Sequence, residues 1–152
     1  MAKRRGDFRA QETALVESQS EGTRFAIDFD AMEASGKSAM FFVRSRMCGD
    51  AQKKADGVSA KQLKDYLKVI STECAGKPDY IGPSTPLSEA VFRLILAANN
   101  RPLSIRDIQD GLTEAWASVI YMKDLSEELL TRLLDRPNSY FIRRAEPGRS
   151  GT

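Results

Sequence analysis

The most regular alternation of apolar and polar positions lies between residues 85 and 144. Thr85 and Pro86 form a helix-start signal, because a threonine N-cap followed by proline suits the first helical turn. Apolar residues then recur at helical spacing: Leu87, Val91, Leu94, Ile95 and Ala98. The polar run 99–102 ends in a proline and is expected to close this first helix.

A second helix is predicted directly after that interruption. Ser104 and Asp107 have the spacing of a capping box, although the acid is aspartate rather than glutamate, so the helix is expected to begin at Ile105. Two ends are compatible with the pattern. Gly111 could cap the helix, or the helix could continue as far as Trp116.

A third helix and a strand complete this half of the chain. Asp124 and Glu127 repeat the capping signature before Pro137 stops the pattern. The apolar positions between them are Leu125, Leu129, Leu130, Leu133 and Leu134. Residues 140–144 are β-prone and predict a strand. Three helices followed by a strand is the order of a winged helix-turn-helix, and this domain is predicted over residues 85–148.

The N-terminal half is predicted to contain a β-hairpin. Apolar residues alternate with others over residues 24–29, as in a half-buried strand, and the apolar run Ala39 to Arg44 would supply its partner. The intervening residues 30–38 would form the loop. A helical interpretation of residues 31–40 stays open.

A helix is expected to follow the hairpin. Ser59 and Gln62 form a capping box, and residues 49–57 before it resemble an exposed connection. The apolar stripe of this helix consists of Leu63, Leu67, Ile70 and Cys74. The overall expectation is an α+β protein with a mobile N-terminal arm at 1–22, a hairpin-plus-helix module at 23–77, a linker at 78–84 and the winged-helix domain.

Composition limits the size and class of the protein more than its partners. A chain of 152 residues with 41% apolar content can form at most two modules. The formal charge of +2 is too small to indicate a partner. No apolar run approaches the ~20 residues of a membrane span, so a soluble cytoplasmic protein is expected. Cys48 and Cys74 are expected to be free thiols.

The residues that usually carry catalysis are scarce. The chain has no histidine, so the commonest general base and metal ligand are both missing, and no enzyme, metal or cofactor is expected. Asp28 and Asp30 could together hold Mg²⁺. The simpler explanation is that Asp28 lies on the outer face of the strand and Asp30 starts the turn. The run 36–38, Gly-Lys-Ser, lacks the first glycine of a phosphate-binding loop and predicts a turn.

Recognition by surface arginines is the remaining possibility. Arg132 and Arg136 lie four residues apart on the predicted third helix, and Arg143 and Arg144 lie on the predicted strand. Together they could bind the phosphates of duplex DNA. Residues 85–144 contain eight basic and eight acidic residues, whereas DNA-binding modules usually carry a basic excess. A solvated face is therefore an equal alternative.

An apolar segment separates the second and third predicted helices. Trp116, Ile120 and Tyr121 belong to it and could fill the core. If exposed, they would form a docking surface for a partner or for a second copy in a homodimer.

Three short motifs resemble the HARE-type winged helices, the group that includes the N-terminal domain of the bacterial RNA polymerase delta subunit. They are the runs 101–108 (RPLSIRDI) and 138–144 (NSYFIRR), followed by Pro147 and Gly148. The resemblance implies a winged helix with a role near transcription or DNA, although some members bind protein. The family continues with another apolar strand, where this chain has Arg149-Ser150-Gly151-Thr152, so only one wing strand is predicted here. No resemblance covers residues 1–80.

The expected function is a non-enzymatic, nucleic-acid-associated or transcription-related role. A protein-interaction or oligomerisation module without direct DNA binding is the alternative.

Overall fold

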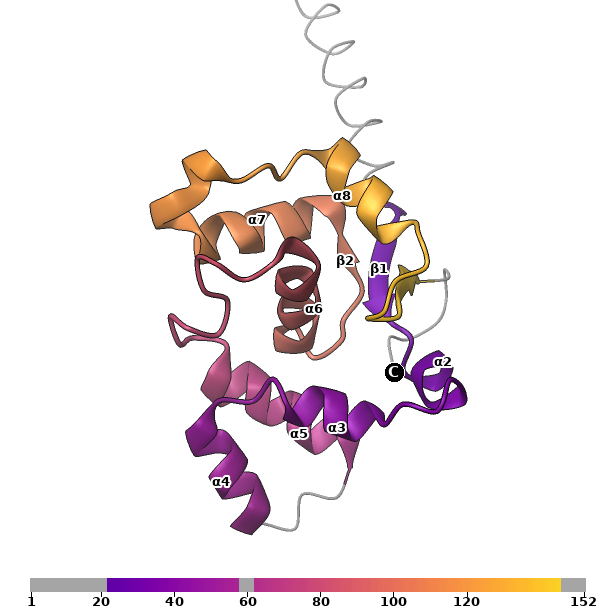
Figure 1. The fold of residues 1–152 in the computed structure, drawn as a ribbon, viewed down its shortest axis with the longest axis vertical. Coiled ribbons are helices and arrows are strands. Elements are labelled where there is room, and N and C mark those ends of the chain that lie inside the picture. Colours follow the sequence, from indigo (N-terminus) through magenta and orange to yellow (C-terminus); the bar gives the residue numbers. More distant parts are fainter. Residues whose placement is uncertain (1–21, 58–61, 146–152) are drawn as a thin grey trace, which may run out of the picture.

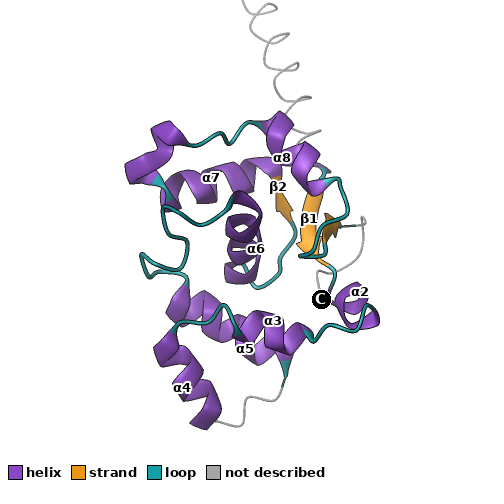
Figure 2. Cartoon of the chain, in the orientation of Figure 1, coloured by secondary structure: helices purple, strands orange, loops and turns teal. Residues whose placement is uncertain are grey.

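The computed structural model describes residues 22–57 and 62–145, which form helices around a small antiparallel sheet (Figures 1 and 2). The predicted α+β class is therefore confirmed. Apart from residue 22, the predicted arm at 1–22 lies outside the described residues. None of the helices in the described ranges combines the length and the apolar composition of a membrane span.

The sheet joins the two ends of the described chain. Its strands are β1 (Arg24–Ile27), β2 (Leu103–Ser104) and β3 (Ile142–Arg144), in the order β2-β1-β3. Phe25 lies opposite Leu103 on one side and Arg144 on the other, and both pairings are antiparallel. The first strand of the sequence is thus the central strand. Phe25 and Ile27 are buried, which confirms the alternation that predicted this strand.

A side chain extends the pairing of β1 beyond Leu103, the first residue of β2. The residue before Leu103 is Pro102, which has no N–H to donate, so the β1–β2 ladder stops there. The buried side chain of Asn100 replaces it: the Ile27 N–H donates to Asn100 Oδ1 at 2.8 Å, and Asn100 Nδ2 donates to the Ile27 carbonyl at 3.0 Å. Asn100 has φ 57°, the left-handed region in which asparagine is tolerated.

The predicted hairpin is wrong, because its second run is helical. The chain forms α2 (Phe29–Ala34) and α3 (Ala39–Arg44), so the helical alternative is partly correct. Asp28 and Ser38 decide this outcome locally, since their side chains accept the backbone N–H groups of Ala31 and Phe41 as N-caps. The run 39–44 buries Ala39 and Val43, which are four residues apart and share one helix face.

The predicted exposed connection is also helical. Residues Gly49–Gly57 form α4, which buries Ala51 in the core. The following helix was predicted correctly, as α5 (Leu63–Val69) continues into a π-helical turn, η1 (Ile70–Cys74). Its capping box joins Gln62 and Asp65, and the predicted cap Ser59 lies outside the described residues.

The C-terminal half contains the helices that the capping signals predicted: α6 (Leu87–Ala97), α7 (Ile105–Ala115) and α8 (Glu127–Leu134). The capping box of α7 is formed as expected. The other two predicted caps are wrong: Ser126 rather than Asp124 caps α8, and α6 begins after Pro86 without a side-chain cap, because Thr85 Oγ1 accepts the Gly82 N–H instead.

Gly111 lies inside α7 instead of ending it. A Cβ at this position would lie 2.7 Å from Leu94 Cδ1, so a larger residue here would displace the Leu94 side chain where α7 approaches α6. The longer of the two predicted helix ends is correct.

One hydrophobic core connects all parts of the described chain. It contains Tyr80 and Ile81 from the predicted linker 78–84, so this segment packs onto the body. Trp116 is also buried, and its Nε1–H donates to the carbonyl oxygen of Gly82 at 2.8 Å. A strand from the predicted N-terminal module and a turn from the predicted linker therefore contribute to the same core as α6, α7 and α8.

Candidate functional site

Of the four predicted phosphate-binding arginines, Arg132 lies in α8, and Arg143 and Arg144 lie on β3. Arg136 was predicted on the same helix as Arg132 but lies two residues beyond the end of α8. Arg136, Arg143 and Arg144 line a surface hollow of about 560 Å³ together with Leu134, Asp135, Pro137 and Ile142. Arg132 lies one turn earlier on α8 and is not among the residues that line it. The structure thus brings three of the four arginines together.

Asn138 shapes the turn that connects α8 to β3. Its Oδ1 accepts the backbone N–H groups of Tyr140 and Ile142, and its Nδ2 donates to the carbonyl oxygens of Arg136 and Ile142. These four bonds replace backbone pairing in a short loop. Phe141, with φ 59°, completes the turn in a conformation that is rare for an aromatic residue. The arginines on either side are thereby held at fixed positions.

Carboxylates pair with three of these arginines. Arg144 binds Asp135 through two contacts of 2.7 Å, Arg143 lies 3.4 Å from Asp28, and Arg132 lies 3.3 Å from Glu128. The hydrogen bond from Arg144 lowers the pKa of Asp135. No ion pair among the described residues involves Arg136. The three arginine side chains are about 60% exposed, so the single contacts of Arg132 and Arg143 are of the weak, solvent-screened kind, whereas the bidentate pair of Arg144 with Asp135 is the stronger one.

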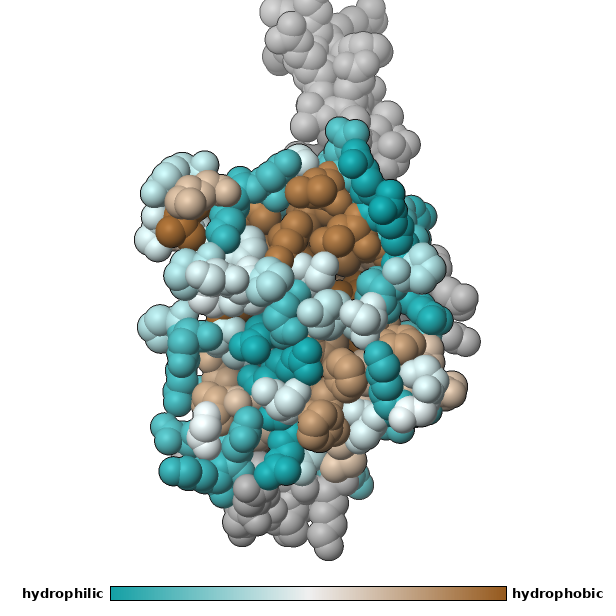
Figure 3. All heavy atoms as spheres, in the orientation of Figure 1, coloured by the Kyte–Doolittle hydropathy of each residue, from teal (hydrophilic) through white to brown (hydrophobic). Residues whose placement is uncertain are grey.

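The predicted partner-binding residues divide between core and surface. Trp116 is buried and unavailable to a partner, so only its core interpretation is correct. Ile120 is half-buried in η2 (Ala117–Met122), whereas Tyr121 and Met122 are 82% and 69% exposed. Figure 3 shows this corner as an apolar projection, separate from a second apolar area between α7 and α8.

A charged cluster that the sequence did not reveal joins α6 to the segment that follows α3. Glu89 accepts hydrogen bonds from Arg46 at 2.9 and 3.1 Å, from Arg93 at 2.8 Å and from the Tyr140 hydroxyl at 3.1 Å. Burial would raise the pKa of Glu89, but the two guanidinium groups outweigh it and lower that pKa. Only the i, i+4 spacing of Glu89 and Arg93 could have been found in the sequence.

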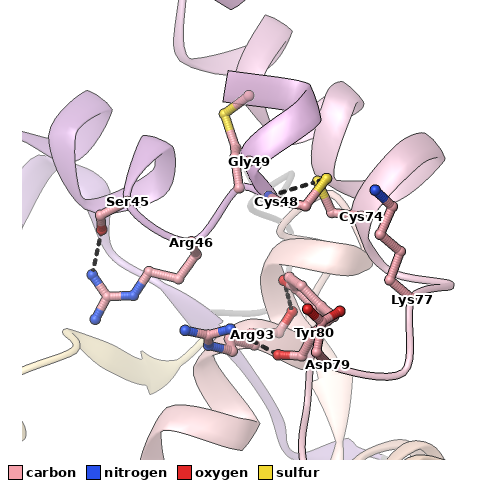
Figure 4. A pocket seen from close by; sticks show the side chains of 10 residues that line it. Ser45, Arg46, Cys48, Gly49, Cys74, Lys77, Asp79, Tyr80 and Arg93 are labelled. Atoms are coloured by element: carbon pink, nitrogen blue, oxygen red, sulfur yellow. Dashed lines mark hydrogen bonds between the residues drawn. The ribbon is translucent and has the colours of Figure 1, made fainter. Parts of the chain in front are cut away.

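A small pocket of about 240 Å³ next to this cluster contains both cysteines (Figure 4). Cys48 and Cys74 are free thiols, as predicted, and their Sγ atoms lie 2.9 Å apart. Lys77 lies at the same end of the pocket, with its Nζ 3.5 Å from Asp50 Oδ2. The cysteines are 26 residues apart in the sequence, and no sequence signal indicated that they would meet.

The aspartates considered for Mg²⁺ have local structural roles. Asp28 caps α2 and Asp30 lies in its first turn, which corrects the predicted position of Asp28 on an outer strand face. The run 36–38 forms the turn between α2 and α3, with Gly36 at φ 92°. Within the described ranges, no three histidine, cysteine, aspartate or glutamate side chains are grouped so that they could hold a metal ion.

The chain was compared with known proteins at three levels. No model of a protein family, no curated protein and no solved structure matches it.

Proposed function

We propose that this protein is a non-enzymatic, nucleic-acid-associated protein, with a winged-helix arrangement in its C-terminal half. Arg136, Arg143 and Arg144 would contact phosphates of duplex DNA, and Arg132 would extend the contact along α8. The observation that carries the proposal is the shared hollow, where cationic side chains from the end of a helix and from an adjacent strand meet.

The order of the elements supports the winged-helix part of the proposal. Three helices, α6 to α8, are followed by β3, and β2 lies between α6 and α7. A wing is a hairpin, so its second strand would lie antiparallel beside β3. In this chain β1 occupies that position, paired to β3 through Ile27 and Ile142. On this proposal β1 would take the place of the second wing strand, although it comes from the opposite end of the described chain.

The ion pairs at the site are compatible with phosphate binding. An exposed arginine–carboxylate pair contributes about 0–1 kcal/mol, because water screens both groups and ordering the side chains costs entropy. A DNA phosphate accepts the same bidentate hydrogen bonds and releases counterions when it binds. Phosphate would therefore displace Asp28 from Arg143 at little cost, and at Arg144 it would have to replace the two hydrogen bonds made with Asp135. The carboxylates would restrict binding to ligands with several phosphates in a row.

Charge reversal at the hollow tests this proposal. In a fluorescence anisotropy titration with duplex DNA at low salt, Arg136→Glu and Arg143→Glu should each weaken binding by about tenfold and lower the salt dependence, since each removes a phosphate contact. Lys53→Glu is the matched control, because Lys53 is exposed on α4 and the substitution changes the net charge by the same amount. Absence of binding by the unmodified chain, or equal weakening by Lys53→Glu, would contradict the proposal.

A second candidate function is self-association through the exposed residues of η2. Tyr121 and Met122 project at one corner, an arrangement more typical of interfaces than of free surfaces. On this hypothesis, sedimentation velocity should show a concentration-dependent dimer. The double variant Tyr121→Ser, Met122→Ser should remain monomeric. Phe41→Ser is the matched control, because Phe41 is 68% exposed on α3. A strict monomer at all concentrations would exclude this homodimer.

A further inference from the structure

The pocket in Figure 4 contains the two cysteines of the chain in direct contact. Cys48 directly precedes α4, and its carbonyl oxygen accepts the N–H of Gln52. Cys74 is the last residue of η1 and is buried. Besides the Sγ–Sγ contact of 2.9 Å, the backbone N–H of Cys48 donates to Cys74 Sγ at 3.2 Å. Both the backbone and the side chain of Cys48 therefore contact the Cys74 sulfur atom.

We propose that Cys48 and Cys74 are a peroxide-reactive thiol pair that closes reversibly into a disulfide. A disulfide requires an S–S distance of about 2.05 Å, so the sulfur atoms need to approach by less than 1 Å from their separation of 2.9 Å. The oxidant is a hydroperoxide, which is small enough for the 240 Å³ pocket.

The two sulfur atoms are not equivalent, which assigns their roles. Cys48 is partly exposed, and the Lys77 side chain lies at the same end of the pocket. Burial opposes ionisation of Cys48, but hydrogen bonds from Cys74 and from the Ala51 N–H, together with Lys77, lower its pKa. Burial and the Cys48 sulfur raise the pKa of Cys74 to about 11. Cys48 is therefore the nucleophile and Cys74 the resolving thiol.

The reaction proceeds in two balanced steps. The Cys48 thiolate attacks one oxygen of the hydroperoxide, the O–O bond breaks, and the second oxygen leaves as water or alcohol after taking up a proton. Cys48 then carries a sulfenic acid. The Cys74 sulfur attacks the Cys48 sulfur, the S–O bond breaks, and the departing hydroxide takes the Cys74 thiol proton and leaves as water. Two thiols are oxidised and one peroxide is reduced.

The disulfide would link the start of α4 to the end of η1. It would close the loop from residue 48 to residue 74, which contains α4 and α5. Restricting the unfolded chain in this way should raise the melting temperature by on the order of 10 °C for a loop of this size. The oxidised and reduced proteins can therefore be distinguished by thermal melting as well as by mass.

Intact-mass spectrometry of the full chain tests the proposal. The reduced protein is treated with one equivalent of hydrogen peroxide, and a loss of about 2 Da with consumption of both thiols is expected. Dithiothreitol should restore the original mass. Retention of both thiols, independent oxidation of each cysteine to higher acids, or a disulfide between two chains would overturn the proposal.

Single-cysteine variants test the assigned roles. Cys74→Ser should leave Cys48 as a sulfenic acid that dimedone captures, whereas Cys48→Ser should leave Cys74 largely unreacted. The reverse result would overturn the assignment. If either variant does not fold, peptide mapping of the unmodified protein after brief dimedone treatment gives the same information, because only the attacking cysteine should be labelled.

Lys77 provides a finer test of positioning. Lys77→Gln should slow disulfide formation by about threefold or more, because loss of the nearby cation raises the pKa of Cys48 and leaves less of it as thiolate. Lys77→Arg should restore most of the rate, because it keeps the charge. Lys53→Gln, on the exposed face of α4, is the matched control. Equal rates for Lys77→Gln and the unmodified chain would exclude this role of Lys77.

Discussion

Replacing Asn100 by alanine is expected to lower the free energy of unfolding by about 3–5 kcal/mol. Its side chain satisfies both backbone groups of Ile27, and each buried group left without a partner costs about 1–3 kcal/mol. Alanine at φ 57° adds about 1 kcal/mol. Chemical denaturation, followed by circular dichroism, measures the change. The end of β1 should also exchange its amide hydrogens faster.

Two further substitutions separate the causes of this loss. Asn99 has φ 63° but is exposed, so Asn99→Ala should cost only the conformational part, about 1 kcal/mol. Asn100→Gly removes the same hydrogen bonds without the strain, and should be about 1 kcal/mol less harmful than Asn100→Ala. If Asn99→Ala and Asn100→Ala are equally destabilising, the side chain does not hold β1.

Replacing Glu89 by glutamine is expected to cost about 2–3 kcal/mol at neutral pH. Glutamine cannot neutralise Arg46 and Arg93, whose side chains are only 17% and 25% exposed, and its amide N–H groups face cationic donors. This loss of stability is smaller than that for breaking a fully buried ion pair, because the site is partly open to water. Glu114→Gln on the exposed face of α7 is the matched control and should be nearly neutral.

The same substitution should change the pH dependence of stability. The pKa of Glu89 is lowered in the folded state, so its contribution is present above the carboxyl's unfolded pKa of about 4.3 and disappears as the pH falls through the folded pKa. The stability difference between the unmodified chain and Glu89→Gln should therefore shrink between about pH 5 and pH 3. A difference that stays constant or widens over this range would contradict the expected ionisation of Glu89.

The sequence by itself located α5, α6, α7 and α8, whereas α2, α3 and α4 fall where a hairpin and a connection were predicted. The cap was predicted correctly at the start of α7, because Ser104 and Asp107 act on backbone groups within three residues, and such capping is visible in a linear string. β propensity gave the wrong prediction for 39–44, where β-prone residues form a helix because Ser38 caps it and one face is buried against the core. Short apolar runs are compatible with either structure until their partners are known.

Only the tertiary structure decided which distant residues meet. β1 was expected to pair with its neighbour in the sequence, but the open edges of β2 and β3 supply its partners instead, and Asn100 extends the pairing. Glu89 joins Arg46 to Tyr140, and Cys48 meets Cys74, each across a long stretch of chain. Backbone caps act over one turn of chain, so they can be predicted from the sequence. Burial and charge pairing act through space, so the sequence contains these residues without showing which of them are in contact.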